Sequence, residues 1–430
     1  MMQVASCSQR LGRLAALPLR ACGGRRPCAA GVRRRTCAAA AAAEPPCPAN
    51  QDPIEWPGLK AWRAAAVDAR RSWGERGPSA AAPPAGDAAA AALPLAPTLV
   101  EAALQVLQTA DPATKAGLAH RAWASYRSGA LPLGAAGRRA PLPAPSRPAR
   151  PARPALVAPK QVPAPKDSPL PLPAHMLHNL AHIELNAIDL AMDTVARFAH
   201  LALPAAFYED FARVADDESR HFCWTLQRLR ELGADYGDMV AHDLLWEGAQ
   251  LSAGDLNARL AIVPMSQEAR GLDAGGRLAQ RLTSAGDART AAVVARIALE
   301  EKAHVAIGVG WFKRVCAATG APPPPSFRAL LAALSPELLK GPFNHEARAE
   351  VGLPREWYDP AAWPPAAAAA LVPPAQAAAA KGRGAPAGGA GGGGGPGAAA
   401  GVGGLGGAGL EELRRRLELM LETEAAAADM

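Results

Sequence analysis

The most constraining feature of this 430-residue chain is a pair of four-residue motifs with the pattern Glu-x-x-His. One motif runs from Glu218 to His221, and the other runs from Glu301 to His304. Residues three positions apart project from the same face of an α-helix, so each motif predicts a carboxylate beside an imidazole on one helix. The sequence contains no third copy of this pattern.

A single glutamate precedes each motif at almost the same distance. Glu184 lies 34 residues before Glu218, and Glu268 lies 33 residues before Glu301. This spacing suits two half-helices joined by a short turn. One glutamate from each of two helices, with Glu-x-x-His from each of two others, is the ligand set of di-iron and di-manganese carboxylate four-helix bundles. We therefore expect metal ligands at Glu184, Glu218, His221, Glu268, Glu301 and His304, with Glu218 and Glu301 as candidate bridging ligands.

Hydrophobic periodicity predicts the helices that carry these residues. Apolar stripes recur at about residues 174–200, 205–232, 255–284 and 287–319. The 47 residues between His221 and Glu268 suit the long crossover of ferritin-like bundles, so we expect it between the second and third helices. Pro264 should start or kink the third helix. The sequence thus predicts an all-α, ferritin-like four-helix bundle.

Further elements are expected before the bundle. Two short helices end near Arg127, with Asp111 as the N-cap and Pro112 at the first position of the second one. The Pro-rich stretch 138–173 contains seven basic residues and should be an extended arm. We interpret the arm as a strap over the bundle, and contact with RNA or an acidic partner is the alternative. The expected organisation is a leader at 1–43, a linker with a short helix at 44–95, a domain at 96–360 with its core at 174–319, and an Ala/Gly/Pro tail at 361–430 ending in a charged helix.

The leader changes what the net charge implies. Residues 1–43 contain eight arginines and no acidic residue, which is typical of an organelle transit peptide, and we expect a plastid rather than a mitochondrion. A basic tail is the alternative. Without the leader, 38 basic residues face 39 acidic ones, so the isoelectric point of 9.2 does not indicate nucleic-acid binding. No apolar run is long enough to predict a transmembrane helix.

Two interpretations of the carboxylates and histidines on these apolar stripes remain open. Burying an unpaired carboxylate costs on the order of several kcal/mol per ion, and bound metal cations would offset this cost. Buried salt bridges and hydrogen-bonded histidines are the alternative, although basic residues on these stripes are few and Arg270 is the nearest. Carboxylates and imidazoles without cysteine favour iron or manganese over zinc. Only Cys223 and Cys316 lie outside the leader region, and we expect them to pack as small hydrophobic side chains.

A second polar stripe lies on the first predicted bundle helix. It faces away from Glu184, because His182 is only two residues from that glutamate. We interpret it as a solvated or inter-element face, with support of the site or a partner contact as the alternative. Its members are His178, His182, Asn186, Asp189 and Asp193.

Several runs together carry a family resemblance. They are His178-Asn-Leu-Ala-His-Ile-Glu184-Leu-Asn-Ala-Ile-Asp189-Leu, Ala215-Asp-Asp-Glu218-Ser-Arg-His221-Phe, Tyr236-Gly-Asp, Glu268-Ala-Arg-Gly-Leu-Asp273, Glu301-Lys-Ala-His304-Val and Gly341-Pro-Phe-Asn. The chain resembles the DUF455 family of ferritin-like proteins over about residues 96–360. The resemblance implies a ferritin-like fold with a di-metal centre and supplies no reaction.

These observations lead to three hypotheses about function. The first is an oxygen-dependent oxidase or hydroxylase with two iron ions, or manganese, per chain, acting on a small-molecule substrate with an external electron donor. The second is metal handling or ferroxidase activity, for which self-association into a homo-oligomer is expected. The third is a non-catalytic helical interaction module. An oxidase needs an apolar pocket beside the metals, whereas a storage protein needs an entry path for ions.

Overall fold

A computed structural model describes residues 55–135, 140–365 and 407–428, all within the unit formed by residues 51–430. These residues are mainly helical, and a short antiparallel hairpin joins β1 (Ser72–Gly74) to β2 (Gly77–Ser79). The expected all-α class is therefore confirmed. The predicted leader and the residues 366–406 of the predicted tail lie outside the described residues.

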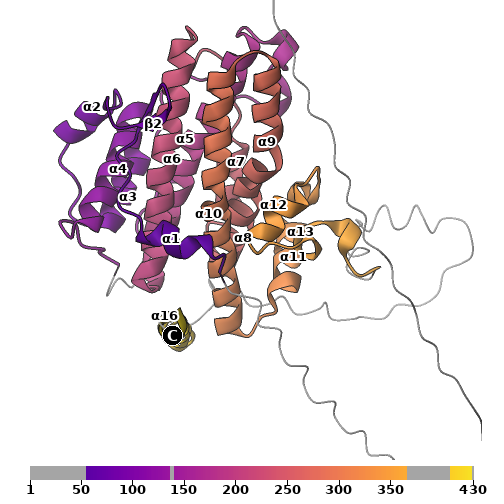
Figure 1. The fold of residues 1–430 in the computed structure, drawn as a ribbon. Coiled ribbons are helices and arrows are strands. Elements are labelled where there is room, and N and C mark those ends of the chain that lie inside the picture. Colours follow the sequence, from indigo (N-terminus) through magenta and orange to yellow (C-terminus); the bar gives the residue numbers. More distant parts are fainter. Residues whose placement is uncertain (1–54, 136–139, 366–406, 429–430) are drawn as a thin grey trace, which may run out of the picture. The chain divides into compact units, whose positions relative to one another are not determined.

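Four long helical segments carry the predicted ligands. α5 (Leu172–Arg197) packs along α6 (Ala205–Glu231), and α10 (Ala288–Thr319) packs against α6 and α9 (Ala269–Ser284). α9 continues from α8 (Leu256–Ile262) through the π-helical turn η4 (Val263–Glu268). Figure 1 shows α5, α6, α10 and α9 running side by side. These bounds agree with the predicted helices to within a few residues.

The apolar stripes explain why these segments pack together. Phe211 and Phe222 on α6 and Val305 and Phe312 on α10 are buried in the same hydrophobic core. Cys223 and Cys316 are buried free thiols, as expected. Burial of such side chains supplies about 1.5–3 kcal/mol each, and it offsets the conformational entropy that the long helices lose. The core therefore fixes the relative rotation of the helices that bear the motif residues.

Pro264 is accommodated by the π-helical turn η4. A proline has no N–H for the helical ladder, and single π turns absorb such defects, often at functional sites. Ser266 Oγ donates to the carbonyl of Ala261 over 2.7 Å, which satisfies one acceptor in this turn. Glu268 is the last residue of η4, so the defect predicted from Pro264 determines where this glutamate points.

Shorter elements precede the bundle. Asp111 accepts a hydrogen bond from Thr114 N and caps α4, and Pro112 is its first residue, as predicted. The segment expected to be a linker with a short helix does contain a short helix, α1, and it also contains the β1–β2 hairpin and a second helix, α2. Gly117 of α4 approaches Ala90 of α2 so closely that an added Cβ would lie 2.7 Å from the Ala90 Cβ. Ala90 is therefore packed against α4, whereas the other alanines of this stretch are exposed. The bounds are α1 (Gly58–Ala64), α2 (Asp87–Ala92), α3 (Leu99–Gln108) and α4 (Pro112–Arg127).

The Pro-rich arm lies against the bundle. Its described part, from residue 140, is extended apart from the 3-10 turns η1 (Pro159–Gln161) and η2 (Pro165–Asp167). Arg150 donates to Asn186 Oδ1 over 2.6 Å, and Arg153 Nε donates to the Gly237 carbonyl over 3.1 Å. These contacts support the interpretation of the arm as a strap.

The charged terminal helix α16 (Gly407–Ala428) packs against α10. Leu413 and Leu417 are buried, and Arg416 donates to the Ala318 carbonyl over 2.8 Å. It is therefore a docked element rather than an independent one. Within the described residues, no helix combines the length and apolar character needed to cross a membrane. The other elements are η3 (Ala199–Leu201), α7 (Leu244–Leu251), α11 (Pro323–Leu334), η5 (Pro336–Leu339), α12 (His345–Glu350), α13 (Arg355–Tyr358) and η6 (Pro360–Ala362).

Candidate metal centre

Four of the six predicted ligands converge into one buried group. Glu184, Glu218, His221 and Glu301 each offer a ligand atom, and these atoms all lie within 4.8 Å of one another. They come from three helices, α5, α6 and α10, so only the packing of the bundle brings them together. Such a group could hold a metal ion.

The two motif glutamates each reach both histidines. Glu218 Oε1 lies 2.9 Å from His304 Nδ1, and its Oε2 lies 3.1 Å from His221 Nδ1. Glu301 repeats the arrangement, with Oε2 3.2 Å from His304 Nδ1 and Oε1 3.5 Å from His221 Nδ1. Each carboxylate therefore spans the space between the two imidazoles, which is the geometry expected of a bridging ligand.

The two lone glutamates interact with different members of the motifs. Glu184 Oε2 is 3.6 Å from His221 Nδ1, and Glu184 is buried. Glu268 interacts electrostatically with Glu218, Glu301 and His304, and it is partly exposed. His304 therefore lies in direct contact with the four-residue group, and Glu268 lies near enough for its charge to interact with the motif residues.

The charges of this cluster shift the pKa values of its members. Burial and the charges of Glu218 and Glu301 raise the pKa of Glu184 and of Glu268 well above its ordinary value. Burial opposes protonation of His221 and His304, but the surrounding carboxylates outweigh it and raise the pKa of both imidazoles.

Glu218 shows the opposite shift. Burial alone would raise the pKa of this carboxyl, but the imidazoles of His304 and His221 lower it well below its usual range. Its two oxygens each face an imidazole nitrogen, with Oε1 2.9 Å from His304 Nδ1 and Oε2 3.1 Å from His221 Nδ1, so the carboxylate is held between the two histidines.

Two further carboxylates hold the outer nitrogens of the histidines. Asp217 Oδ2 lies 3.3 Å from His304 Nε2, and Glu300 Oε2 lies 3.0 Å from His221 Nε2. Each therefore orients an imidazole so that Nδ1 faces the cluster. The sequence prediction did not include them. The available signal was an acidic residue directly before each motif glutamate, but nothing in the sequence indicated the cross-helix pairing.

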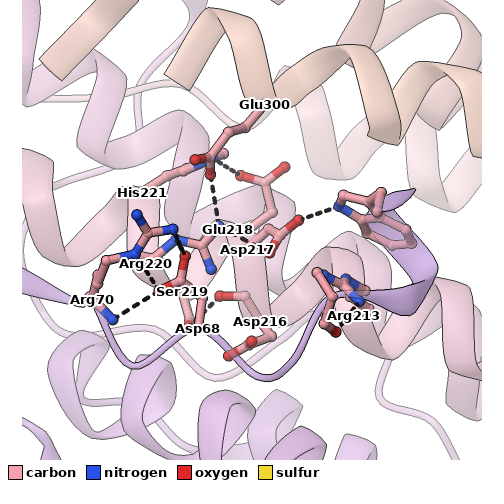
Figure 2. A network of polar contacts seen from close by, with 12 residues as sticks. Asp68, Arg70, Arg213, Asp216, Asp217, Glu218, Ser219, Arg220, His221 and Glu300 are labelled. Atoms are coloured by element: carbon pink, nitrogen blue, oxygen red, sulfur yellow. Dashed lines mark hydrogen bonds and ion pairs between the residues drawn. The ribbon is translucent and has the colours of Figure 1, made fainter. Parts of the chain in front are cut away.

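One arginine joins these two outer carboxylates. Arg220 donates to Asp217 Oδ1 over 2.9 Å and to Glu300 Oε2 over 2.6 Å, and Figure 2 shows it between this pair and Asp68. The expectation that Arg270 is the nearest basic residue is wrong, because Arg270 NH2 donates outward to the carbonyl of Lys340 over 2.6 Å. The missed arginine, Arg220, lies inside the motif Glu218–His221, and its guanidinium pairs with both outer carboxylates.

Close backbone approaches hold the third helical segment beside α10. An added Cβ at Gly308 would lie 2.5 Å from the Cβ of Pro264, and one at Gly271 would lie 3.2 Å from Cγ of Glu301. Glycine at these two positions lets η4 and α9 approach α10 closely. The short separation brings Glu268 within reach of the motif residues of α10.

The second polar stripe of α5 is buried rather than solvated. Asp189 pairs with Lys115 over 2.6 Å, and Asp193 pairs with Arg259 over 2.6 Å. His182 Nε2 lies 2.8 Å from the His242 carbonyl, and Gly237 N donates to His178 Nε2 over 3.0 Å. The solvated interpretation of this stripe is wrong, and the inter-element interpretation is correct.

A cavity of about 220 Å³ lies between the arm and α5. Arg150, Leu156, His182 and Tyr236 are among its lining residues, and none of the six predicted ligands lines it. It therefore belongs to the interface between the strap and the bundle.

Comparisons with known proteins place this chain among relatives without assigned function. A family described as "Protein of unknown function (DUF455)" matches residues 108–359. An "Uncharacterized protein" of Haemophilus influenzae is 37% identical over 209 residues, which cover 47% of this chain and 73% of the relative. No solved structure matches the chain. The family match covers more than half of the sequence and contains all six candidate ligands, so the chain belongs to the DUF455 family.

Proposed function

We propose that this protein binds two metal ions at the buried cluster and uses them for an oxygen-dependent oxidation. The observation that carries the proposal is the placement of Glu218 and Glu301, each with one oxygen near Nδ1 of each histidine. Glu184 and His221 would complete one metal position, and Glu268 and His304 the other. This division matches the ligand set of ferritin-like carboxylate bundles.

The donor set supports iron or manganese. It consists of carboxylate oxygens and imidazole nitrogens, which suit these metals. The thiols of Cys223 and Cys316 are not part of this donor set, because both pack in the hydrophobic core. Binding would displace protons from His221 and His304, whose pKa values the carboxylates raise.

The protein's own residues would tune and shield such a centre. Asp217 and Glu300 fix the direction of the two imidazoles and increase their basicity as ligands. Trp224, whose ring centroid lies 5.7 Å from that of His221, is buried and excludes water from that side. When bound, a pair of iron ions would supply the reduction of O2 that drives substrate oxidation.

Metal handling is the second candidate, and one observation favours it. Glu268 is partly exposed, whereas Glu184, Glu218 and Glu301 are buried. A cluster residue that reaches the surface would mark where cations enter, which ferroxidase activity or metal transfer would need. This candidate uses the same six residues and differs in the fate of the metal.

Oxygen consumption by the iron-loaded full chain separates the two candidates. The protein is loaded anaerobically with Fe(II), supplied with a chemical reductant, and followed with an oxygen electrode. We expect continued O2 consumption at about two bound iron ions per chain. A single burst followed by accumulation of further Fe(III) would instead support metal handling, and no effect of bound iron on O2 consumption would contradict both.

A further inference from the structure

The two outer carboxylates have different second partners. Glu300 Oε1 accepts from Arg296 Nε over 2.6 Å, and the Arg296 side chain is 37% exposed. Asp217 Oδ2 accepts from the indole Nε1 of Trp62 over 2.8 Å, and the same oxygen faces His304. The His221 side is thus anchored from within α10 by a surface arginine, whereas the His304 side is anchored by a tryptophan from α1.

Trp62 lies outside the region that matches the family. The family match begins at residue 108, and Trp62 belongs to the segment 55–79, which runs along α6. Arg63 pairs with Asp210 over 2.6 Å, and Trp224 Nε1 donates to the Arg70 carbonyl over 2.9 Å. These contacts hold the residues that follow Trp62 on α6.

The indole itself is held by a second interaction. The guanidinium of Arg213 lies 4.3 Å from the centroid of the Trp62 ring, and Arg213 NH1 donates to the Ala65 carbonyl over 3.0 Å. A ring fixed in this way donates its N–H in a constant direction. It restricts the Asp217 carboxylate to the rotamer that meets His304 Nε2.

We propose that Trp62 is a positioning residue for the metal position at His304, and that the segment 55–79 thereby gives the two metal positions unequal affinities. The proposal rests on the proposed function, because it assumes that the cluster binds two ions. Outer partners of metal-ligating histidines typically change metal affinity about 10–100-fold. Trp62 acts through Asp217, whose direct imidazole contact is His304, so its loss should weaken the ion at His304 and spare the other.

The test compares Trp62→Phe with Arg296→Met in the full chain. Phenylalanine keeps a ring over Arg213 and removes the N–H donor. Co(II), whose visible spectrum reports its coordination, is titrated anaerobically against a competing chelator. For the wild type we expect two ions per chain. For Trp62→Phe we expect one ion bound as before and one weakened about 10-fold, the lower end of the effect of losing an outer partner, because Asp217 itself remains.

A control variant and a replacement variant complete the test. Arg296→Met, which removes an exposed donor, should weaken either ion by only a few fold. If Trp62→Phe fails to fold, as judged by circular dichroism, Arg213→Lys replaces it, because loosening the ring should weaken the same single ion.

Two results overturn the proposal. One is equal weakening of both ions in a folded Trp62→Phe or Arg213→Lys variant, and the other is an unchanged titration. Failure of the proposed function looks different, since the wild type itself would then bind no ion.

Discussion

Asp217 on α6 lies against Nε2 of His304 on α10, at 3.3 Å, so the residue before one motif glutamate meets the histidine of the other motif. Glu300 on α10 repeats this relationship with His221 on α6, at 3.0 Å. The two Glu-x-x-His helices are therefore joined twice outside the cluster. This reciprocal arrangement makes the centre depend on the register between α6 and α10.

The outer carboxylates should be needed for tight metal binding. Asp217→Asn and Glu300→Gln each remove the negative charge that orients an imidazole, and we expect metal affinity to fall about 10–100-fold in either variant. Competition titration with a chelator measures this effect. Glu231→Gln, at the exposed end of α6, is the matched control and should leave the affinity unchanged. Equal affinities in all three variants would exclude a role for the outer carboxylates.

Two neighbouring glycines of α9 should respond oppositely to alanine. An added Cβ at Gly275 would lie 2.4 Å from the Ala298 Cβ of α10, so Gly275→Ala should lower the free energy of unfolding by about 1–3 kcal/mol. At Gly276 an added Cβ meets nothing within 4 Å, so Gly276→Ala should raise this free energy by up to about 1 kcal/mol. Urea unfolding of the two variants measures both changes. If both variants changed the free energy of unfolding in the same direction, α9 would not approach α10 as described.

The buried pair of Lys115 and Asp189 should be costly to break. Their side chains are 1% and 0% exposed, and Asp189→Asn leaves the lysine charge buried with a weaker partner. We expect a loss of about 3 kcal/mol in the free energy of unfolding. Arg230→Ala, in a pair whose side chains are 47% and 51% exposed, should change it by less than about 1 kcal/mol. Chemical denaturation compares the two, and equal losses would contradict the burial of this pair.

The stability of the fold should depend on pH through the buried imidazole of His178. Burial lowers the pKa of its imidazole to about 4 from 6.5, and Nε2 must stay unprotonated to accept from Gly237 N. Asp238 is the acidic group that opposes this shift. The unfolded chain binds more protons than the folded chain between about pH 6.5 and pH 4, so stability is complete above this window and is lost as pH falls through it.

Within this pH window, the titration of His178 should lower the free energy of unfolding by up to about 1.4 kcal/mol for each unit by which the pH falls. His178→Gln should flatten the dependence, because glutamine carries no titrating group. Thermal unfolding between pH 7 and pH 4 measures it, and parallel curves for wild type and variant would show that His178 does not contribute.

The sequence predicted the bundle helices because their signals are local. Apolar stripes, the Asp111 cap and the Pro264 defect each act within one or two turns of helix, and the structure has the corresponding elements. The grouped residues Glu184, Glu218, His221 and Glu301 were also predictable, since spacings of 33 and 34 residues between the lone glutamates and the motif glutamates reflect two similar helical hairpins.

The remaining features depend on packing between distant segments. The contact of Trp62 with Asp217 joins residues 155 apart, and the contact of Glu300 with His221 depends on how two helices are rotated. Alanine and proline between residues 80 and 96 suggested a linker, but Ala90 is buried against α4. Composition cannot distinguish small residues that allow close packing from small residues that connect.

The central claim is that the cluster binds two metal ions, and metal content tests it most directly. The full chain and a Glu218→Gln/Glu301→Gln variant are loaded anaerobically with Fe(II) or Mn(II), desalted, and analysed by elemental mass spectrometry. We predict about two ions per wild-type chain and their loss in the variant, with helical content unchanged by circular dichroism. No bound metal in the wild type, or the same content in the variant, would contradict the claim and favour a helical interaction module.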